Sequence, residues 1–363
     1  MIGALRRGGP MARRSWAPAF LCCLLVLTWV LVEAFGDFFY TATAVRMFLL
    51  LIVVLGLQIF SGNSGVLSFG HVAFMAIGAY TSALLTIPTE IKDFTFLTMP
   101  NILKSWVFPA QLGTLEGTLA GAGFALVFAL IVAAPIVRLA GVQAGIGTLA
   151  VLVIVQVFIV QTSAITRGTS TMIGVPHTTA FAHVLIWVLI FLVVAFVFQG
   201  SRFGLRLRAS RENERAARSV GVRVSVERAI AWTLSGFVVG VGGALYGHYY
   251  ETFGPRDFYF NTNGLDIVLL PIAMLVVGGM TSVTGAVTGC YLVMVVYSAF
   301  NRLEVNGLLG AKAPSGTTNL VLAFVLLVTL VLRPKGITGG SEIPWPSEWR
   351  LPRRRPLSLP SRQ

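Results

Sequence analysis

The chain has 363 residues, of which 56% are hydrophobic and 11% are charged, and its mean hydropathy is +0.82. Soluble domains carry about a quarter charged residues, so this composition excludes an ordinary soluble enzyme or binding module. A membrane barrel would show alternating segments of about ten residues, which this sequence lacks. The net charge of +13 lies beside long apolar runs, which indicates membrane topology and not nucleic-acid binding. The sequence therefore predicts an all-α, polytopic transmembrane helical bundle.

Long apolar runs recur along the chain, and a helix needs roughly 20 apolar residues to cross a bilayer core of about 30 Å. The sequence predicts about ten spans, some of them broken or re-entrant, over residues 18–36, 39–60, 65–87, 115–137, 144–164, 182–199, 229–250, 264–279, 284–300 and 317–332. Whether the runs 264–279 and 284–300 cross or re-enter stays open. A basic N-terminus (1–17) precedes the membrane domain (18–333), and a Pro/Arg-rich tail (334–363), expected to be disordered, follows it.

The basic residues indicate the orientation of the spans. Ten crossings put both termini on one side. If that side is the cytoplasm, twenty Lys and Arg side chains lie inside and six outside, as the positive-inside rule requires, and Arg46 falls within a span. The first run resembles a signal peptide with a cleavage site at residues 32–34, but it is long enough to span, which favours a retained helix. Residues 88–113 are expected along the outer surface, and the tail is either solvated or in contact with anionic lipid.

Glycine and small polar residues interrupt the apolar runs at two places. The segment 61–65 (Ser-Gly-Asn-Ser-Gly) separates the second and third spans, and 278–285 separates the eighth and ninth. In lipid a broken helix is tolerated only where protein or a watery cavity satisfies its backbone, and transporters use such breaks in substrate pathways. A pathway and a tight turn explain these breaks equally well. Close helix packing is the better explanation for the glycines of the seventh span, Gly236, Gly240, Gly243 and Gly247.

The most charged part of the chain lies between two apolar runs, at residues 201–228. It holds eight arginines and three glutamates, so we expect a water-exposed cytoplasmic segment that a partner protein can contact. The pattern from Arg211 to Val220 indicates one amphipathic helix that Gly221 would cap, and its residues available for packing are Ala216, Ala217 and Val220. Such a helix is usually only a solvated face. Its position as the only long cytoplasmic segment between spans favours a coupling role.

Several kinds of chemistry find little support. No lysine follows a glycine-rich turn, so the chain lacks a P-loop and does not hydrolyse ATP itself. The histidines and cysteines lack metal-ligand spacing, so no metal site is predicted. An ion-coupled secondary transporter is poorly supported, because the acidic residues fall near span ends, at Glu33, Asp37, Glu116 and Asp266. Gly62-Asn63-Ser64-Gly65 matches the motif of rhomboid-type intramembrane serine proteases, with His248 as the base, but four-residue matches are common in glycine-rich membrane chains.

Five longer motifs stand in a fixed order along the chain. GVLSFGHVAFMAIGAY (65–80) and SRFGLRLRASRENERAARSVG (201–221) come first, and LSGFVVGVGGALY, VVGGMTSVTGAVTG and LRPKGITG follow. A weaker match runs from RLAGVQAGIGTLA to TRGTSTMIGVP. Together they resemble the permeases of branched-chain amino acid ATP-binding cassette (ABC) transporters over about residues 45–340. The likeness is greatest to the M-type subunit, which pairs with a second, different permease.

The resemblance implies a permease subunit of an importer in the bacterial cytoplasmic (inner) membrane, with both termini in the cytoplasm. It implies three kinds of protein partner: a second permease, two ATP-binding subunits and an external substrate-binding protein. No cofactor is expected on this chain, because the partner subunits bind the ATP. The implied ATPase-coupling residues are Arg211, Glu212, Asn213, Glu214, Arg215, Ala216, Ala217 and Gly221. The family's EAA-x3-G motif is altered here, since Glu214 is displaced by one position, and Arg167 stands where the family tends to have glycine.

A path for branched-chain amino acids should be narrow and weakly polar, because the external protein supplies the affinity. The residues expected to line it are Gln58, Asn63, Ser64, Ser68, His71, Thr148 and Gln156. Core packing or helix–helix hydrogen bonding explains each of them equally well. Importers of urea and short-chain amides share much of the same pattern, and they are the nearest alternative for the substrate.

Overall fold

The computed structural model describes residues 10–96, 98–139, 141–260, 267–306, 314 and 316–343. These residues are mostly helical, and the extended pairing among them is a single isolated bridge between Met172 and Phe253. The predicted all-α membrane fold is therefore confirmed. Asp266, Lys312 and most of the predicted tail lie outside the described residues.

Seven helices among the described residues are long and apolar enough to cross a membrane. They contain α1 (Pro10–Phe35), α2 (Phe38–Leu57), α6 (Thr114–Ile136), α7 (Gly141–Gln161), α9 (Phe181–Gly200), α12 (Val224–Tyr250) and α14 (Val283–Asn306). Three shorter apolar helices are α3 (His71–Thr86), α13 (Leu269–Gly278) and α15 (Thr317–Leu332). These ten helices correspond one to one with the predicted runs. Helix α13 has only 10 residues, so at 1.5 Å per residue it is about half as long as a bilayer core is thick.

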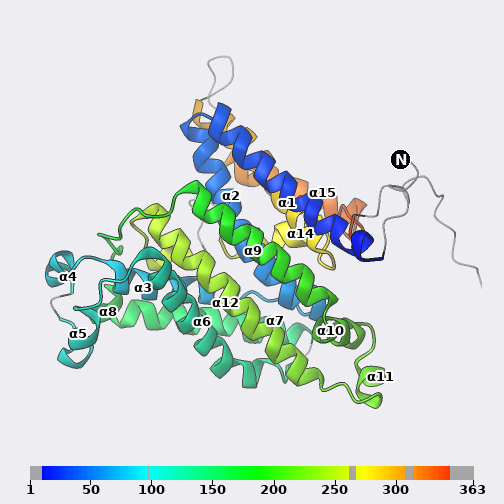
Figure 1. The fold of residues 1–363 in the computed structure, drawn as a ribbon, viewed down its shortest axis with the longest axis horizontal. Helices are drawn as coiled ribbons and strands as arrows, with labels where there is room; N and C mark the ends of the chain where they lie inside the picture. Colours follow the sequence, from blue (N-terminus) through cyan, green and yellow to red (C-terminus); the bar gives the residue numbers. More distant parts are fainter. Residues whose placement is uncertain are drawn as a thin grey trace, which may run out of the picture.

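Short helices lie at the two ends of the bundle (Figure 1). Helices α10 (Arg202–Glu212) and α11 (Glu214–Ser219) join α9 to α12 at one end, which we name the α10 end. Helices α4 (Thr89–Thr95) and α5 (Asn101–Val107) lie at the opposite end, near the four-residue α8 (Ser163–Thr166). Helix α12 begins at the α10 end, and its 27 residues give it a length of about 40 Å. A 3-10 turn, η3 (Pro255–Phe258), follows its far end.

Helix α12 is the centre of the fold and packs mainly against α3 and α6. Its glycines permit backbone-to-backbone contact: a Cβ atom on Gly243 would lie 1.9 Å from the Met75 carbonyl oxygen, and one on Gly240 would lie 2.6 Å from the Ala125 Cβ. Gly78 of α3 meets the Gly240 carbonyl oxygen in the same way, at 2.1 Å. Small residues at helix interfaces let the backbones approach closely. The packing explanation for the α12 glycines is confirmed.

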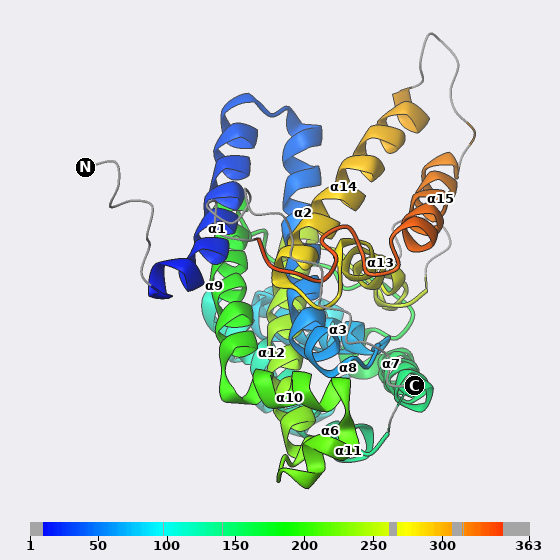
Figure 2. The same ribbon diagram turned by 90° about the vertical axis from the view of Figure 1, so that its right-hand side faces the viewer.

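Helices α1 and α15, the first and last helices of the described residues, lie on either side of α2 and α14 in Figure 2. Helix α1 packs against α9 and α2, and the Thr28 hydroxyl lies 2.8 Å from the Tyr291 hydroxyl of α14. Helices α13 and α14 form a tight antiparallel pair, and α15 returns beside α14. The segment after α15, residues 333–343, then runs back to the break between α13 and α14.

Two sequence-based expectations about local structure were wrong. The third span begins as a helix only at His71, because residues 65–70 are non-helical and Gly65 adopts a φ of +73°. Residues 211–220 are not one helix: Asn213 is extended (φ −153°, ψ 102°), and its side chain accepts a hydrogen bond from the Ala216 amide. Asparagine favours this N-cap role over the helix interior, so α10 ends there and α11 begins.

Candidate functional site

The first polar break is built as a π-helical turn followed by an extended loop. The turn, η2 (Gln58–Gly62), continues α2, and the Asn63 amide nitrogen donates to the carbonyl oxygens of Gln58 and Ile59 at 3.2 and 3.0 Å. Single π-turns inside α-helices are frequent at functional sites. Both amide atoms of Gln58, the Ser61 hydroxyl and the Asn63 Oδ1 are buried without a hydrogen-bond partner among the described residues. The break thus retains polar groups that the fold does not use.

His71 ties the loop of this break to α12. Its ring nitrogens lie 2.6 Å from the Ser68 hydroxyl and 2.8 Å from the Ser235 hydroxyl. The imidazole is fully buried among three aromatic rings, those of Phe60, Phe74 and Trp232, at centroid distances of 5.0 to 5.8 Å. A buried imidazole with both nitrogens bonded has a fixed orientation. His71 therefore positions the loop, and Ser235 is a partner that the sequence did not indicate.

Thr148 of α7 holds the same loop from the other side. Its hydroxyl accepts from the Phe69 amide at 3.1 Å and donates to the Gly145 carbonyl oxygen at 2.8 Å. A Cβ atom on Gly70 would lie 2.2 Å from the Thr148 carbonyl oxygen. The loop is consequently clamped between α7 and α12.

The second polar break, between α13 and α14, is closed by the segment after α15. The Ile337 and Thr338 amides donate to the carbonyl oxygens of Val277 and Gly278 at 2.8 and 3.1 Å. The Glu342 carboxylate accepts from the amides of Val283 and Thr284, at 2.8 and 3.0 Å, and so caps the N-terminus of α14. A carboxylate at this position is favoured by the helix dipole and satisfies amides that have no partner within the helix.

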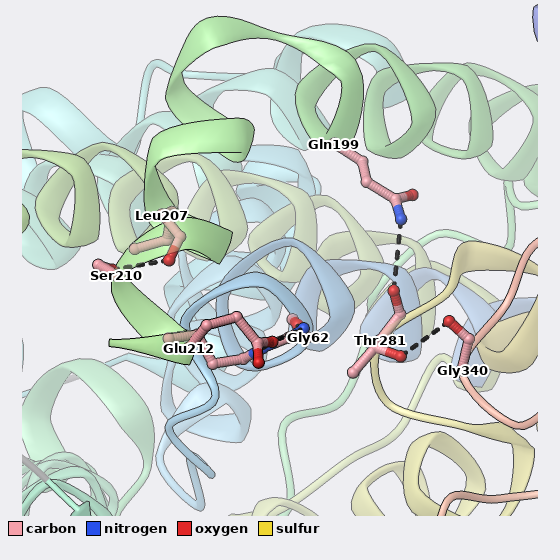
Figure 3. A network of polar contacts seen from close by, with 8 residues as sticks. Gly62, Gln199, Leu207, Ser210, Glu212, Thr281 and Gly340 are labelled. Carbon is pink, nitrogen blue, oxygen red and sulfur yellow. Dashed lines mark hydrogen bonds and ion pairs between the residues drawn. The ribbon is translucent and has the colours of Figure 1, made fainter. Parts of the chain in front are cut away.

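The two breaks meet at the α10 end, although more than 200 residues separate them in the sequence. A Cβ atom on Gly62 would lie 2.4 Å from the Met280 carbonyl oxygen. Next to this contact, the Gln199 amide at the end of α9 donates to the Thr281 carbonyl oxygen at 3.3 Å, and the Thr281 hydroxyl donates to the Gly340 carbonyl oxygen at 2.9 Å (Figure 3). We name this region, formed by residues 58–65, 278–284 and 336–342, the joint.

Arg211 of α10 contacts the joint directly. Its guanidinium donates to the Gly62 carbonyl oxygen at 2.8 Å and pairs with the Glu212 carboxylate at 2.8 Å. Its methylene groups lie against Gly65, where a Cβ atom would come within 2.5 Å of the Arg211 Cγ. The side chain is only 23% exposed. Arg211 is thus an internal link from the charged segment to the broken helix.

The other residues of the charged segment fall into two groups. Some form ion pairs or are buried against α12, and others are exposed to solvent. Glu214 pairs with Arg218 at 2.5 Å and with the buried Arg228 of α12 at 3.0 Å. Gly221 ends α11 with a φ of +86°, and the Val222 amide donates to the Ala217 carbonyl oxygen, which is the glycine C-cap expected from the sequence. Of the three residues expected to pack, only Ala217 is buried. Ala216 and Val220 are exposed, Val220 to 79%, as is Arg215.

Most of the expected path residues gather at the first break. Gln58, Asn63, Ser64, Ser68, His71 and Thr148 are all buried there. Gln156 is only half-buried and lies eight residues, about 12 Å, further along α7. Neither of the two pockets described on the structure is lined by any of these seven residues. Their role in a translocation path remains a prediction.

The positions of Ser64 and His248 do not support the protease alternative. His248 lies 2.9 Å from the Ser82 hydroxyl and 3.2 Å from the Pro176 carbonyl oxygen, near the end of α12. Ser64 lies at the first break, close to the α10 end, where its hydroxyl accepts from the Val66 amide. Ser235, which sits beside that break, is 13 residues or about 20 Å of helix away from His248. A serine–histidine dyad requires hydrogen-bond distance.

The carboxylates of the described residues all lie near helix ends or in loops. Glu33, Asp37 and Glu116 are exposed, and the buried Glu227 is in the first turn of α12, where it pairs with Arg206 at 3.3 Å. Among the described residues, no group of three His, Cys, Asp or Glu side chains is arranged to hold a metal ion.

Residues 88–113 form two short helices at the end opposite α10. Helix α4 is bent by 115° from α3, and the buried Lys92 ammonium donates to the carbonyl oxygens of Val107 and Ala110 at 2.9 and 2.6 Å. Burial lowers the pKa of Lys92 to about 8. Nearby in the fold, Arg167 adopts a φ of +65°, a left-handed conformation that explains why glycine suits this position.

Comparison with known proteins supplies the family. Residues 39–331 match the family described as branched-chain amino acid transport system / permease component. The chain belongs to this family. The LivM permease of the high-affinity branched-chain amino acid transport system of Salmonella typhimurium is 25% identical over 357 residues, covering 88% of this chain and 74% of LivM. A probable branched-chain amino acid permease, LivH of Methanocaldococcus jannaschii, is 26% identical over 44% of this chain and 48% of its own.

A relative with a different named substrate also matches. LsrC, an autoinducer 2 import permease of Photorhabdus luminescens, is 28% identical over 40% of this chain and 42% of its own length. No solved structure matches the chain significantly. The expected resemblance to branched-chain amino acid ABC permeases is confirmed. Four of the five motifs that carried it lie within the matched residues, and LRPKGITG (332–339) directly follows them.

Proposed function

We propose that this permease forms, with a second and different permease, the translocation path of an ATP-driven importer of branched-chain amino acids. Two separate ATP-binding subunits would bind the α10 end, and an external protein would deliver the substrate to the opposite end. The positive-inside distribution supports this orientation, because the eight arginines of residues 201–228 lie at the α10 end. Both termini are then cytoplasmic.

The observation that carries the proposal is the two-sided construction of α10 and α11. The outward side presents Arg215, Ala216 and the 79% exposed Val220. Val220, an exposed apolar side chain among charges, offers an apolar contact to a partner. On the inward side, the Arg211 guanidinium donates a hydrogen bond to the Gly62 carbonyl oxygen of the broken helix. Motion imposed on the outer side is therefore transmitted to the joint by a direct hydrogen bond.

Docking of the ATPases can be tested by co-expressing this permease with the two ATPases and the second permease. Val220→Asp and Arg215→Glu place new negative charge on the outward side and should abolish co-purification of the ATPases. Arg256→Glu is the matched control, because Arg256 is exposed in η3 at the opposite end. Co-purification that is unaffected by Val220→Asp and Arg215→Glu would remove the docking role from α11.

The substrate is tested on the partner binding protein. Branched-chain amino acids, urea, short-chain amides and the autoinducer named for LsrC relatives are compared by calorimetry, and binding of leucine, isoleucine and valine alone supports the proposal. Uptake that survives loss of the ATPases and collapses with an uncoupler would instead establish ion coupling. Ser64→Ala tests the protease alternative, since that variant should still support uptake.

A further inference from the structure

A cavity of about 590 Å³ opens at the end of the molecule opposite α10, between α2, α9, α12 and α14. Its walls are largely aromatic and include Phe181, Tyr249, Tyr250 and Tyr297. Small-molecule sites are typically clefts of about 300–1,000 Å³ with apolar walls and a few placed polar groups. The volume and lining of this cavity match that description.

One charged side chain, Arg46, projects into the cavity from within a membrane span. Its Nε donates to the Tyr250 hydroxyl at 2.8 Å, and its Nη1 lies 3.5 Å from the Tyr297 hydroxyl. Among the described residues, no carboxylate lies within ion-pair distance of this guanidinium. Charged residues inside membrane spans are costly, and they usually pair or serve a substrate pathway. A guanidinium has five N–H donors in a fork that matches a carboxylate, so Arg46 retains donors for an anionic ligand.

A second polar group on the cavity wall has no partner. The Thr179 side chain is 1% exposed, it lines the cavity, and its hydroxyl oxygen makes no hydrogen bond within the described residues. A buried hydroxyl normally finds a partner, and leaving it unpaired costs free energy. At the rim, the His177 ring pairs with the Glu251 carboxylate at 3.0 Å, so this carboxylate is already engaged.

These features together specify the ligand. We propose that the cavity binds an α-amino acid with an apolar side chain: Arg46 takes the carboxylate, the Thr179 hydroxyl oxygen accepts from the ammonium, and the aromatic walls contact the side chain. Anionic oxygens on an apolar body also occur in lipid headgroups, and several of these also carry hydroxyl or ammonium donors. The two nanodisc lipids of the test below separate this source from a free amino acid. The site's position on the entry side of the path rests on the proposed function, whereas binding itself does not.

The test uses the purified full chain, without partner subunits, and ligand-detected saturation-transfer NMR with leucine as the probe. Leucine should bind, and leucinamide, which lacks the carboxylate, should bind at least tenfold more weakly. Arg46→Met should weaken leucine binding about 10- to 100-fold, the loss expected for hydrogen bonds to a charged group. Arg302→Met is the matched control, because Arg302 lies at the same end and contacts the rings of Phe39 and Tyr40 without lining the cavity.

A second variant separates the two polar groups. Thr179→Val keeps the shape of the side chain and should weaken leucine about fivefold while leaving 4-methylpentanoate, which has no ammonium, unchanged. Equal loss in Arg46→Met and Arg302→Met, or equal binding of leucine and leucinamide, would overturn the proposal. So would leucine binding that appears in phosphatidylcholine nanodiscs and disappears in phosphatidylglycerol nanodiscs, which would assign the cavity to lipid. Failure to co-purify with ATPases would refute the proposed function and leave this result standing.

Discussion

The link from Arg211 to Gly62 gives the most direct test of how the charged segment acts. We expect Arg211→Met to leave ATP hydrolysis by the assembled importer intact and to reduce uptake per ATP hydrolysed. Methionine retains apolar contact with Gly65 and removes the guanidinium that donates to the Gly62 carbonyl oxygen at 2.8 Å. The outward residues Arg215 and Val220 are untouched, so docking of the ATPases should persist.

The magnitude follows from the groups that lose their partner. A hydrogen bond from a charged donor contributes about 1.5–3 kcal/mol, and the Gly62 carbonyl oxygen, in a residue at the end of η2, loses this donor. The pair with Glu212 adds little, because that carboxylate is 74% exposed and such pairs contribute about 0–1 kcal/mol. A loss of about 2 kcal/mol in coupling corresponds to roughly a 30-fold decrease in the ratio of uptake to hydrolysis.

The assay is transport into proteoliposomes with simultaneous measurement of phosphate release. Arg202→Met is the matched control, because Arg202 is exposed on the same helix and contacts only the ring of its neighbour Phe203 among the described residues. Gly65→Ala disturbs the same contact from the other side, since its φ of +73° and the Arg211 methylenes both oppose a Cβ atom. The double variant should therefore be less impaired than the sum of the single variants. An Arg211→Met permease with wild-type uptake per ATP would refute the link.

Three further predictions concern stability at other places. Glu342→Ala should destabilise the first turn of α14 by about 1 kcal/mol, measured as faster amide hydrogen exchange at Val283 and Thr284 than in the wild type. Arg167→Gly should be more stable than Arg167→Ala by about 1 kcal/mol in thermal unfolding, because only glycine relieves the left-handed backbone while both lose the same side chain. The pKa of Lys92 is lowered to about 8, so the folded chain releases this proton before the unfolded chain does, and stability should rise between pH 8 and 10.5. Thermal unfolding at pH 7 and 9.5 should show this gain in the wild type and not in Lys92→Met.

The sequence was sufficient for the features that depend on local pattern. Hydropathy located the ten helices, and the glycines of α12 and Gly221 were assigned their packing and capping roles. These assignments succeeded because each depends on residues within a turn or two of one another. The break at Asn213 also has a local signal, since asparagine between two charged stretches is a common N-cap, and we misjudged it by treating residues 211–220 as one amphipathic pattern.

The joint could not be predicted, because its contacts connect distant segments. Nothing near Gly62 indicates that its neighbour is Met280, and nothing near Glu342 indicates that it caps α14. The same holds for Arg211, because its hydrogen bond to the Gly62 carbonyl oxygen joins residues 149 positions apart in the sequence. Gln156 was included with the path residues for its polarity alone, and the structure places it away from them.

The free energies of the hydrogen bonds at the joint are in the range typical of a conformational switch and not of a rigid attachment. Its carbonyl groups are satisfied by donors from separate segments: Gly62 by Arg211, Thr281 by Gln199, and Gly278 by the amide and hydroxyl of Thr338. Losing one such bond costs about 1–3 kcal/mol, which shifts a two-state equilibrium about 5- to 150-fold, the range of ordinary allosteric coupling. The unpartnered amide of Gln58 lies in the same region and offers an alternative partner once a bond there breaks. If α10 moves with the ATPases as proposed, a small displacement of it would exchange one set of partners for another without unfolding a span.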